Sequence, residues 1–179
     1  MSNDTNKPEP RKKISLGSKK LRGFFLSHLD KIYSAKAHLV NHLPTIKEEA
    51  HFADLKIAVR ETIEDVERQM ARMEVIYELL DSSPNNANCG GLAGLVDDAF
   101  EDIKKHAKEN ELRDMSIVFY LQNIESLEMA SFQVLQMAAV KLRNKQIKQL
   151  LRENYDEAKA DRTLLLLIGS KYIVSSTGS

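Results

Sequence analysis

Apolar residues recur along this chain at steps of three and four positions, and four long segments carry the pattern. Such spacing places the apolar side chains on one face of an α-helix. The pattern is clearest over residues 117–142, in Ile117, Leu121, Ile124, Leu135, Ala138 and Leu142. Two positions of that face hold Glu128 and Ser131 instead. Because a charged side chain is almost never fully buried without a partner, Glu128 is either a paired structural charge or part of a site.

The first half of the chain predicts two long helices with a very short connection. The first helix is expected to begin near Ser18 and to stop at Pro44. Thr45 and Glu48 have the spacing of a capping box, which starts the second helix at once. The core face of the second helix is expected to consist of Val59, Ile63, Val66, Met70, Met73, Tyr77 and Leu80.

The second half predicts a loop, a short helix and two further long helices. Residues 81–91 contain Pro, Asn, Ser and Gly and are typical of a loop. A short helix over about 92–108 precedes long helices over about 110–143 and 145–172. No segment alternates as a strand does. We therefore predict an all-α four-helix bundle, with a short connector helix in the crossover between two helical pairs.

Charge and length favour one domain without a nucleic-acid partner. The 179 residues carry 26 basic and 26 acidic side chains, so the chain has no net field to attract nucleic acid. Basic residues crowd the N-terminus, but no aromatic residues are interleaved for base stacking. We expect residues 1–17 to be a disordered basic arm, 18–174 the bundle, and 175–179 a flexible tail.

The sequence also predicts a cytoplasmic protein that makes no membrane contact. The longest apolar run, Leu164–Ile168, is far shorter than the roughly 20 residues that span a bilayer. The N-terminus lacks an apolar signal segment. The single cysteine, Cys89, excludes an internal disulfide and fits a reducing compartment, although any redox role of its own stays open.

Charged residues interrupt or border the core face of every long helix near its middle. They are Lys36, Glu67, Glu128, Glu157 and Asp161, with Glu64 and Glu125 within reach. Convergent carboxylates inside a helical bundle can bind two metal ions, and hard oxygen donors suit Mn, Fe(II), Mg or Ca. The alternative is a buried polar layer in which Lys36 neutralises carboxylates and bound protons replace a metal. The pattern leaves both interpretations open.

Two histidines one turn apart, His38 and His42, could chelate a metal ion. Their positions lie away from the face that contains Lys36, and ligation normally needs further converging partners. We therefore interpret them as solvated residues of the outer face.

Several spaced motifs occur in one order over about residues 21–173. These motifs are Tyr33-Ser34-Ala35, Ile63-Glu64-Asp65, Arg72, Cys89 with Gly94-Leu95, Glu125, Glu128 through Phe132, and Leu150-Leu151-Arg152-Glu153 through Glu157 and Lys159. Together they resemble the YciE/YciF family of ferritin-like bacterial stress-response proteins. The resemblance implies a ferritin-like bundle, often dimeric, with a two-metal site of carboxylates and histidine. Glu64, Glu128 and Glu157 match acidic positions of that pattern.

This chain departs from the family pattern at positions that matter for metal binding. Lys36 stands where the family has a glutamate, and Glu67 replaces the histidine of the second-helix Glu-x-x-His. Ala158 and Arg162 stand where acidic residues are common. A lysine ammonium only donates hydrogen bonds and cannot ligate a metal while protonated. We therefore expect a degenerate or altered site. In it, Lys36 forms a buried charge network with Glu128 and Glu157 and is paired with Glu128 or another of the carboxylates in place of a metal.

Two functions follow from the core residues together with the family resemblance, which is what implies the association with stress. The first is a stress-associated bundle without catalytic activity, which binds no cofactor. The second is an oxidase or peroxide-handling protein that binds Fe or Mn through the core carboxylates.

The last helix predicts a homodimer. The five consecutive apolar residues of Leu164–Ile168 cover every side of a helix, and Ile173 and Val174 extend the excess. A monomeric bundle buries one face of each helix, so the surplus should meet the connector helix or a second subunit. A two-fold dimer is the commonest oligomer.

Overall fold

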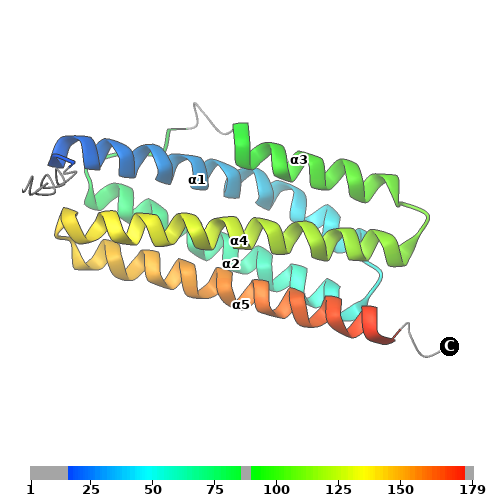
Figure 1. Ribbon diagram of the computed structural model, residues 1–179. Coiled ribbons are helices and arrows are strands. Elements are labelled where there is room, and N and C mark those ends of the chain that lie inside the picture. The colour runs from blue at the N-terminus through cyan, green and yellow to red at the C-terminus, as the bar shows by residue number, and fades with distance from the viewer. Residues whose placement is uncertain (1–15, 86–89, 176–179) are drawn as a thin grey trace, which may run out of the picture.

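The computed structural model describes residues 16–85 and 90–175, and this part of the chain forms five helices. They are α1 (Ser18–Glu49), α2 (Ala53–Leu79), α3 (Gly90–Lys105), α4 (Asn110–Leu142) and α5 (Lys145–Ser175). The four long helices lie side by side, and the shorter α3 packs outside the bundle along α1 and α4 (Figure 1). The predicted four-helix bundle with a connector helix in its crossover is confirmed.

The buried core is divided into two apolar clusters, one toward each end of the bundle. One cluster includes Leu39, Val59 and Leu165. The other includes Phe25, Met73, Phe132, Leu135 and Ile147. In all four long helices the residues between the two clusters include buried polar side chains. The bundle therefore has a polar layer at its middle.

The predicted end of the first helix at Pro44 is wrong, because α1 continues through the proline to Glu49. A proline inside a helix removes one backbone hydrogen bond and costs roughly 3 kcal/mol. Leu43 and Ile46, on either side of Pro44, are fully buried in the core. Their packing holds the helix together across the proline.

The chain instead turns at residues 50–52, and a carboxylate from another helix stabilises this turn. Asp114 of α4 is fully buried. Its oxygens accept the His51 N–H at 2.9 and 2.8 Å and the Phe52 N–H at 2.5 Å. These donors lie at the N-terminus of α2, where backbone N–H groups have no partner within the helix. Asp114 therefore caps α2 from outside.

The core face of α2 differs from the predicted one at three positions. Leu80 is only partly buried at the C-terminal end of the helix, and the two other positions lie in its middle. Thr62 and Gln69 are buried, whereas the expected Ile63 and Met70 are partly buried at the edge of one apolar cluster. A purely hydrophobic criterion chose the wrong neighbour at both positions. The inward side of α2 is polar where it meets the middle layer.

Some expectations fall on residues outside the described ranges. These are most of the basic arm predicted over 1–17, all but Ser175 of the tail predicted over 175–179, and Cys89. Within residues 16–85 and 90–175, no helix combines the length and the apolar character needed to cross a membrane.

Candidate functional site

Four ionisable side chains from three helices meet in the middle of the bundle. We define the charge layer as Lys36 of α1, Glu125 and Glu128 of α4, and Asp161 of α5. Their exposed fractions are 0%, 1%, 2% and 6% in that order. Each occupies a core-facing position, and buried apolar residues of the same helix lie about a turn away from it, on both sides of Lys36, Glu128 and Asp161 and on the N-terminal side of Glu125. The fold therefore forces these charges into a water-poor interior.

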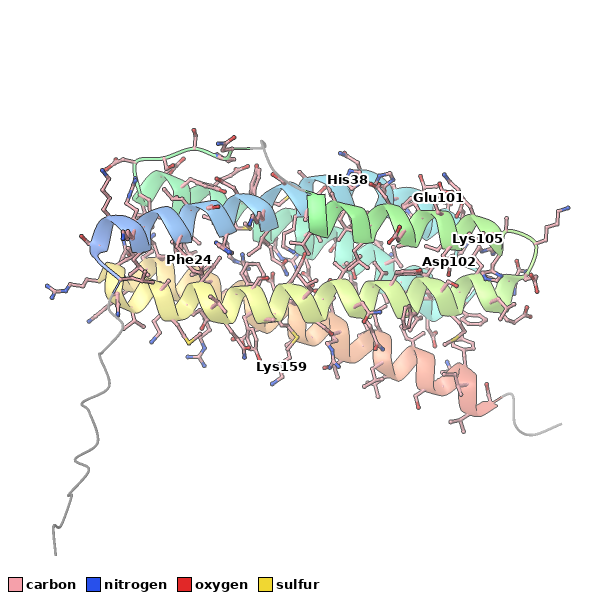
Figure 2. The ribbon with its side chains drawn as sticks, turned by 45° about the horizontal axis from the view of Figure 1, so that its top comes forward. Phe24, His38, Glu101, Asp102, Lys105 and Lys159 are labelled. Carbon is pink, nitrogen blue, oxygen red and sulfur yellow. The ribbon has the colours of Figure 1, made fainter. Side chains whose placement is uncertain are left out.

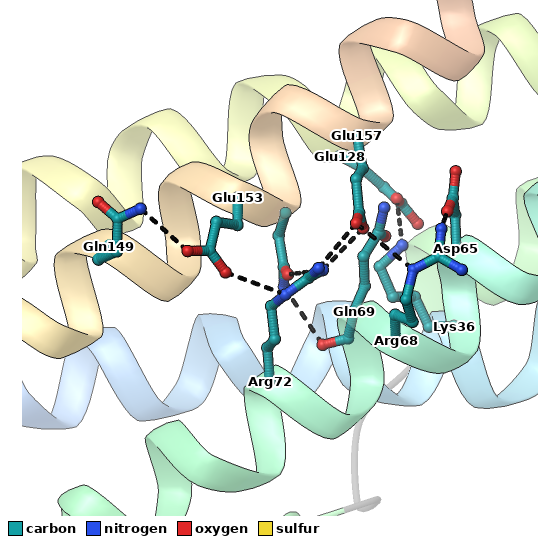
Figure 3. Close-up of polar contacts among 10 residues, drawn as sticks. Lys36, Asp65, Arg68, Gln69, Arg72, Glu128, Gln149, Glu153 and Glu157 are labelled. Atoms are coloured by element: carbon teal, nitrogen blue, oxygen red, sulfur yellow. Dashed lines mark hydrogen bonds and ion pairs between the residues drawn. The ribbon is translucent and has the colours of Figure 1, made fainter.

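Lys36 and Glu128 form a buried ion pair. The Lys36 Nζ donates a hydrogen bond to Glu128 Oε2, as Figure 3 shows. The ammonium also lies 5.8 Å from the centre of the Phe132 ring, within the range of a cation–π contact. Burial of a charge is costly unless a partner compensates it, and here each charge compensates the other.

Glu125 and Asp161 bind protons more tightly than exposed carboxyl groups do. Burial raises the pKa of Glu125 well above its usual value, and the charge of Glu128 adds to this effect more than Lys36 offsets it. Burial likewise raises the pKa of Asp161 to about 6, although Lys36 opposes the shift. Glu125 Oε2 and Asp161 Oδ2 are buried and have no hydrogen-bond partner among the described residues. Protons are thus retained on this layer under conditions in which exposed carboxyl groups lose them.

Glu157 belongs to a second network, at the edge of the charge layer. Arg72 donates two hydrogen bonds of 2.7 Å to its carboxylate, and Arg68 Nε lies 3.6 Å away. Arg72 also approaches Glu153 at 3.2 Å, as Figure 3 shows. It donates a further hydrogen bond of 3.3 Å to Asn154 Oδ1. Glu157, which we expected in one charge network with Lys36 and Glu128, is instead bound by Arg72 through both of its oxygens.

The two arginines also set the ionisation of Glu157. Burial raises its pKa, but the hydrogen bonds and charge of Arg72, with the charge of Arg68, outweigh burial and lower the net pKa. Arg72 is part of the sequence motif, but its partner could not be read from the sequence. Residues 72 and 157 lie 85 positions apart in the chain.

The two candidate ligands on α2 do not reach the charge layer. Glu64 and Glu67 are exposed, so the expectation that they converge with the core carboxylates is wrong. The inward positions of α2 at this level are Val66 and Gln69. Gln69 had no distinguishing signal in the sequence, yet its backbone oxygen accepts a hydrogen bond of 3.3 Å from Asn154.

The donor set of the charge layer does not fit a two-metal bundle site. Such sites combine carboxylates from two helices with a Glu-x-x-His element from each of the other two. The described residues place no imidazole in the layer, and its lysine is bonded to one of the three carboxylates. Carboxylate oxygens remain on Glu125 and Asp161, but α2 contributes no carboxylate to the layer.

The fold and this layer define the class of the protein: a four-helix bundle with a connector helix in its crossover and ionisable groups in its core. A family model described as a domain of unknown function, DUF892, matches residues 20–173. The chain therefore belongs to this family, the YciE/YciF family.

Comparisons with individual proteins agree with this assignment. The chain is 28% identical over 149 residues to the protein YciF of Escherichia coli K12, which covers 81% of this chain and 87% of that protein. The crystal structure of the E. coli stress protein YciF matches with a TM-score of 0.81 at 24% identity, over 87% of this chain and 98% of that one. YcfI, a candidate structural protein from Rhodopseudomonas palustris, matches with a TM-score of 0.77 at 27% identity, over 86% and 97%.

Proposed function

We propose that this protein is a non-catalytic, ferritin-like member of its family that acts in the bacterial stress response. In this proposal Lys36, paired with Glu128, takes the place of a metal ion in the bundle core. The observation that carries it is the position of the Lys36 ammonium, fully buried between two apolar clusters and bonded to Glu128. The stress role is supported by the similarity to YciF, which is described as a stress protein.

Charge balance supports the absence of a metal requirement. The Lys36 ammonium neutralises one carboxylate, and the raised pKa of Glu125 favours the protonated, neutral form of that group. Asp161, whose pKa is about 6, can bind a proton when the pH falls slightly below neutral. Protons and one lysine thus provide the positive charge that a metal ion would otherwise supply.

A cytoplasmic location is part of the same proposal. The chain has a single cysteine and cannot form an internal disulfide, so nothing in its covalent structure depends on an oxidising compartment. A reducing cytoplasm suits such a chain.

Metal analysis tests the proposal. Protein purified from cells supplied with iron and manganese should contain neither metal in the core. Glu128→Gln and Glu125→Gln should therefore leave the content of both metals unchanged. Two ions of Fe or Mn per chain that disappear in these variants would contradict the proposal. That result would support the second function, an oxidase or peroxide-handling protein. The observation in favour of this second function is that Glu125 and Asp161 each have one buried carboxylate oxygen without a hydrogen-bond partner among the described residues.

We also propose that the protein is a homodimer that forms through α4 and α5. Phe119 of α4 is 62% exposed, and Leu166 and Leu167 of α5 are 50% and 62% exposed. Phe119 and Leu166 line one apolar groove together with Met115 and Val118. The connector helix packs on α1 and α4, on the other side of the bundle from this part of α5. A second copy of the chain is the occupant that we propose, because association about a two-fold axis, the commonest form of oligomer, would cover this apolar face.

A further inference from the structure

Outside the charge layer, three potential metal ligands meet where α3 packs on α1. His38 and His42 lie one turn apart on α1, and Asp97 comes from α3. One ligand atom from each residue lies within 4.8 Å of the other two. His38 Nε2 and Asp97 Oδ1 are 2.8 Å apart. Figure 2 shows His38 at the border between the two helices. The interpretation of these histidines as simply solvated overlooked Asp97, which lies 59 positions after His38.

The three donors suit a zinc-class ion. Zinc binds imidazole nitrogen and carboxylate oxygen at about 2.0–2.2 Å in tetrahedral geometry, which places neighbouring donors about 3.3 Å apart. Side-chain rotations on the surface can bring the present separations to that value. Two imidazoles and one carboxylate leave the fourth position to water. Magnesium and calcium prefer oxygen ligands only, so the imidazoles select against them.

The surroundings prepare His42 for ligation. Its ring packs on Phe100 of α3 with centroids 4.1 Å apart and meets the His38 ring edge-on at 4.6 Å. The His38 and Asp97 side chains are 34% and 63% exposed, so an ion can enter from solvent.

We propose that His38, His42 and Asp97 bind one zinc-class divalent ion that ties the connector helix α3 to α1. The connector buries only three residues, Val96, Ala99 and Ile103. A metal bridge adds a strong link between α1 and a helix that is otherwise held by a small apolar face. This site is independent of the charge layer and of the function proposed for it.

Zinc titration of the full chain, without any affinity tag, tests the binding. Calorimetry with Zn²⁺, and visible absorption with Co²⁺ as a spectroscopic substitute, should report one ion per chain. His42→Ala and Asp97→Asn should each weaken Zn²⁺ binding at least about tenfold, in line with other changes to metal sites. Excess Mg²⁺ should not compete.

Matched controls separate this site from other histidines, acids and the core. His28→Ala removes another histidine of α1, which contacts the Phe24 carbonyl of its own helix, and should leave zinc affinity unchanged. Asp98→Asn removes the neighbouring exposed acid, and Glu128→Gln alters the core. Neither substitution should change the affinity for zinc. The proposal is overturned if the parent binds no zinc, if His42→Ala binds as well as the parent, or if Glu128→Gln alone abolishes binding.

Hydrogen exchange tests the link between the helices. Zinc should slow the exchange of α3 amides in the parent and leave them unchanged in Asp97→Asn. Equal exchange with and without zinc in the parent would refute the bridging role.

Discussion

At the scale of single residues, the behaviour of the core depends on which carboxyl groups carry protons. Lys36 forms its hydrogen bond with Glu128, so Glu125 and Asp161 benefit only from its charge. Burial therefore destabilises the ionised forms of these two groups more than that of Glu128. Their raised pKa values are the result of this destabilisation.

Asp161 makes stability depend on pH in a defined direction. Its pKa is about 6 in the folded protein, against an ordinary 3.8, so the folded state binds the proton more tightly than the unfolded state. Stability should therefore decrease as the pH rises from about 4 to about 6 and then level off. The side chain of Asp161→Asn is neutral at every pH, so this variant avoids the cost of burying a negative charge. It should therefore be more stable than the parent above pH 6, by roughly 3 kcal/mol at most.

Urea denaturation of the parent and Asp161→Asn between pH 4 and pH 7 measures this effect. The difference between the two proteins should be smallest at pH 4. A difference that stays constant over the whole range would show that Asp161 titrates alike in both states.

Single residues also show how far the sequence could predict the site. Lys36 and Glu128 were recognisable because each interrupts an otherwise apolar helix face, and the structure pairs them. Glu67 was misplaced because it lies at the border of its face, where a small rotation of the helix decides between core and solvent. The Arg72–Glu157 pair could not be predicted, because the packing of whole helices decides which residues far apart in the sequence come into contact.

At the scale of elements, the ends of helices depend on tertiary contacts more than on local signals. Pro44 and the Thr45/Glu48 spacing predicted a boundary, but packing of Leu43 and Ile46 carries α1 past it. The true boundary is stabilised by Asp114, a residue of α4, for which the sequence near the turn contains no signal.

Asp114→Ala should therefore destabilise the protein although it lies far from the charge layer. The substitution leaves the His51 and Phe52 N–H groups without their acceptor and removes hydrogen bonds to a charged group. We expect a loss of about 1.5–3 kcal/mol in the free energy of unfolding. Chemical denaturation measures it, with Asp98→Ala, an exposed acid of α3, as the control. Equal stability of the two variants would show that Asp114 is not a cap.

At the scale of the whole molecule, the arrangement of helices was predictable because it depends on the period and length of apolar segments. Each long helix shows a repeated apolar face, and five helices of the expected kind and order are present among the described residues. Sequence periodicity says little about contacts between subunits, however. The apolar residues exposed on α4 and α5 are not buried by the packing of a single copy of the bundle.

Leu166→Lys should convert a dimer into a monomer without unfolding it. Leu166 is half exposed and lines the apolar groove on α4 and α5. A lysine there would stay hydrated in the monomer but would lose its water in the dimer, which destabilises the dimer alone. Light scattering over a range of concentrations should give twice the chain mass for the parent and the chain mass for the variant. Leu79→Lys, at an exposed apolar position on α2, should remain dimeric. A parent that stays monomeric at high concentration would exclude the dimer.

The central claim is that Lys36 replaces a metal ion, and the response of Lys36→Glu to metal tests it most directly. All proteins should carry His42→Ala, which removes a ligand of the zinc site that we propose at His38, His42 and Asp97. Lys36→Met should lose about 3–5 kcal/mol, because it leaves Glu128 buried without a partner, and metal should not restore the loss. Lys36→Glu adds repulsion without metal but supplies a further carboxylate ligand.

The measurement is the shift in melting temperature on addition of Mn²⁺. Lys36→Glu should gain stability, because Mn²⁺ binds its folded state in preference to the unfolded state, whereas the protein with Lys36 should not change. An equal gain with Lys36 present, or no gain in Lys36→Glu, would contradict the replacement of a metal by this lysine.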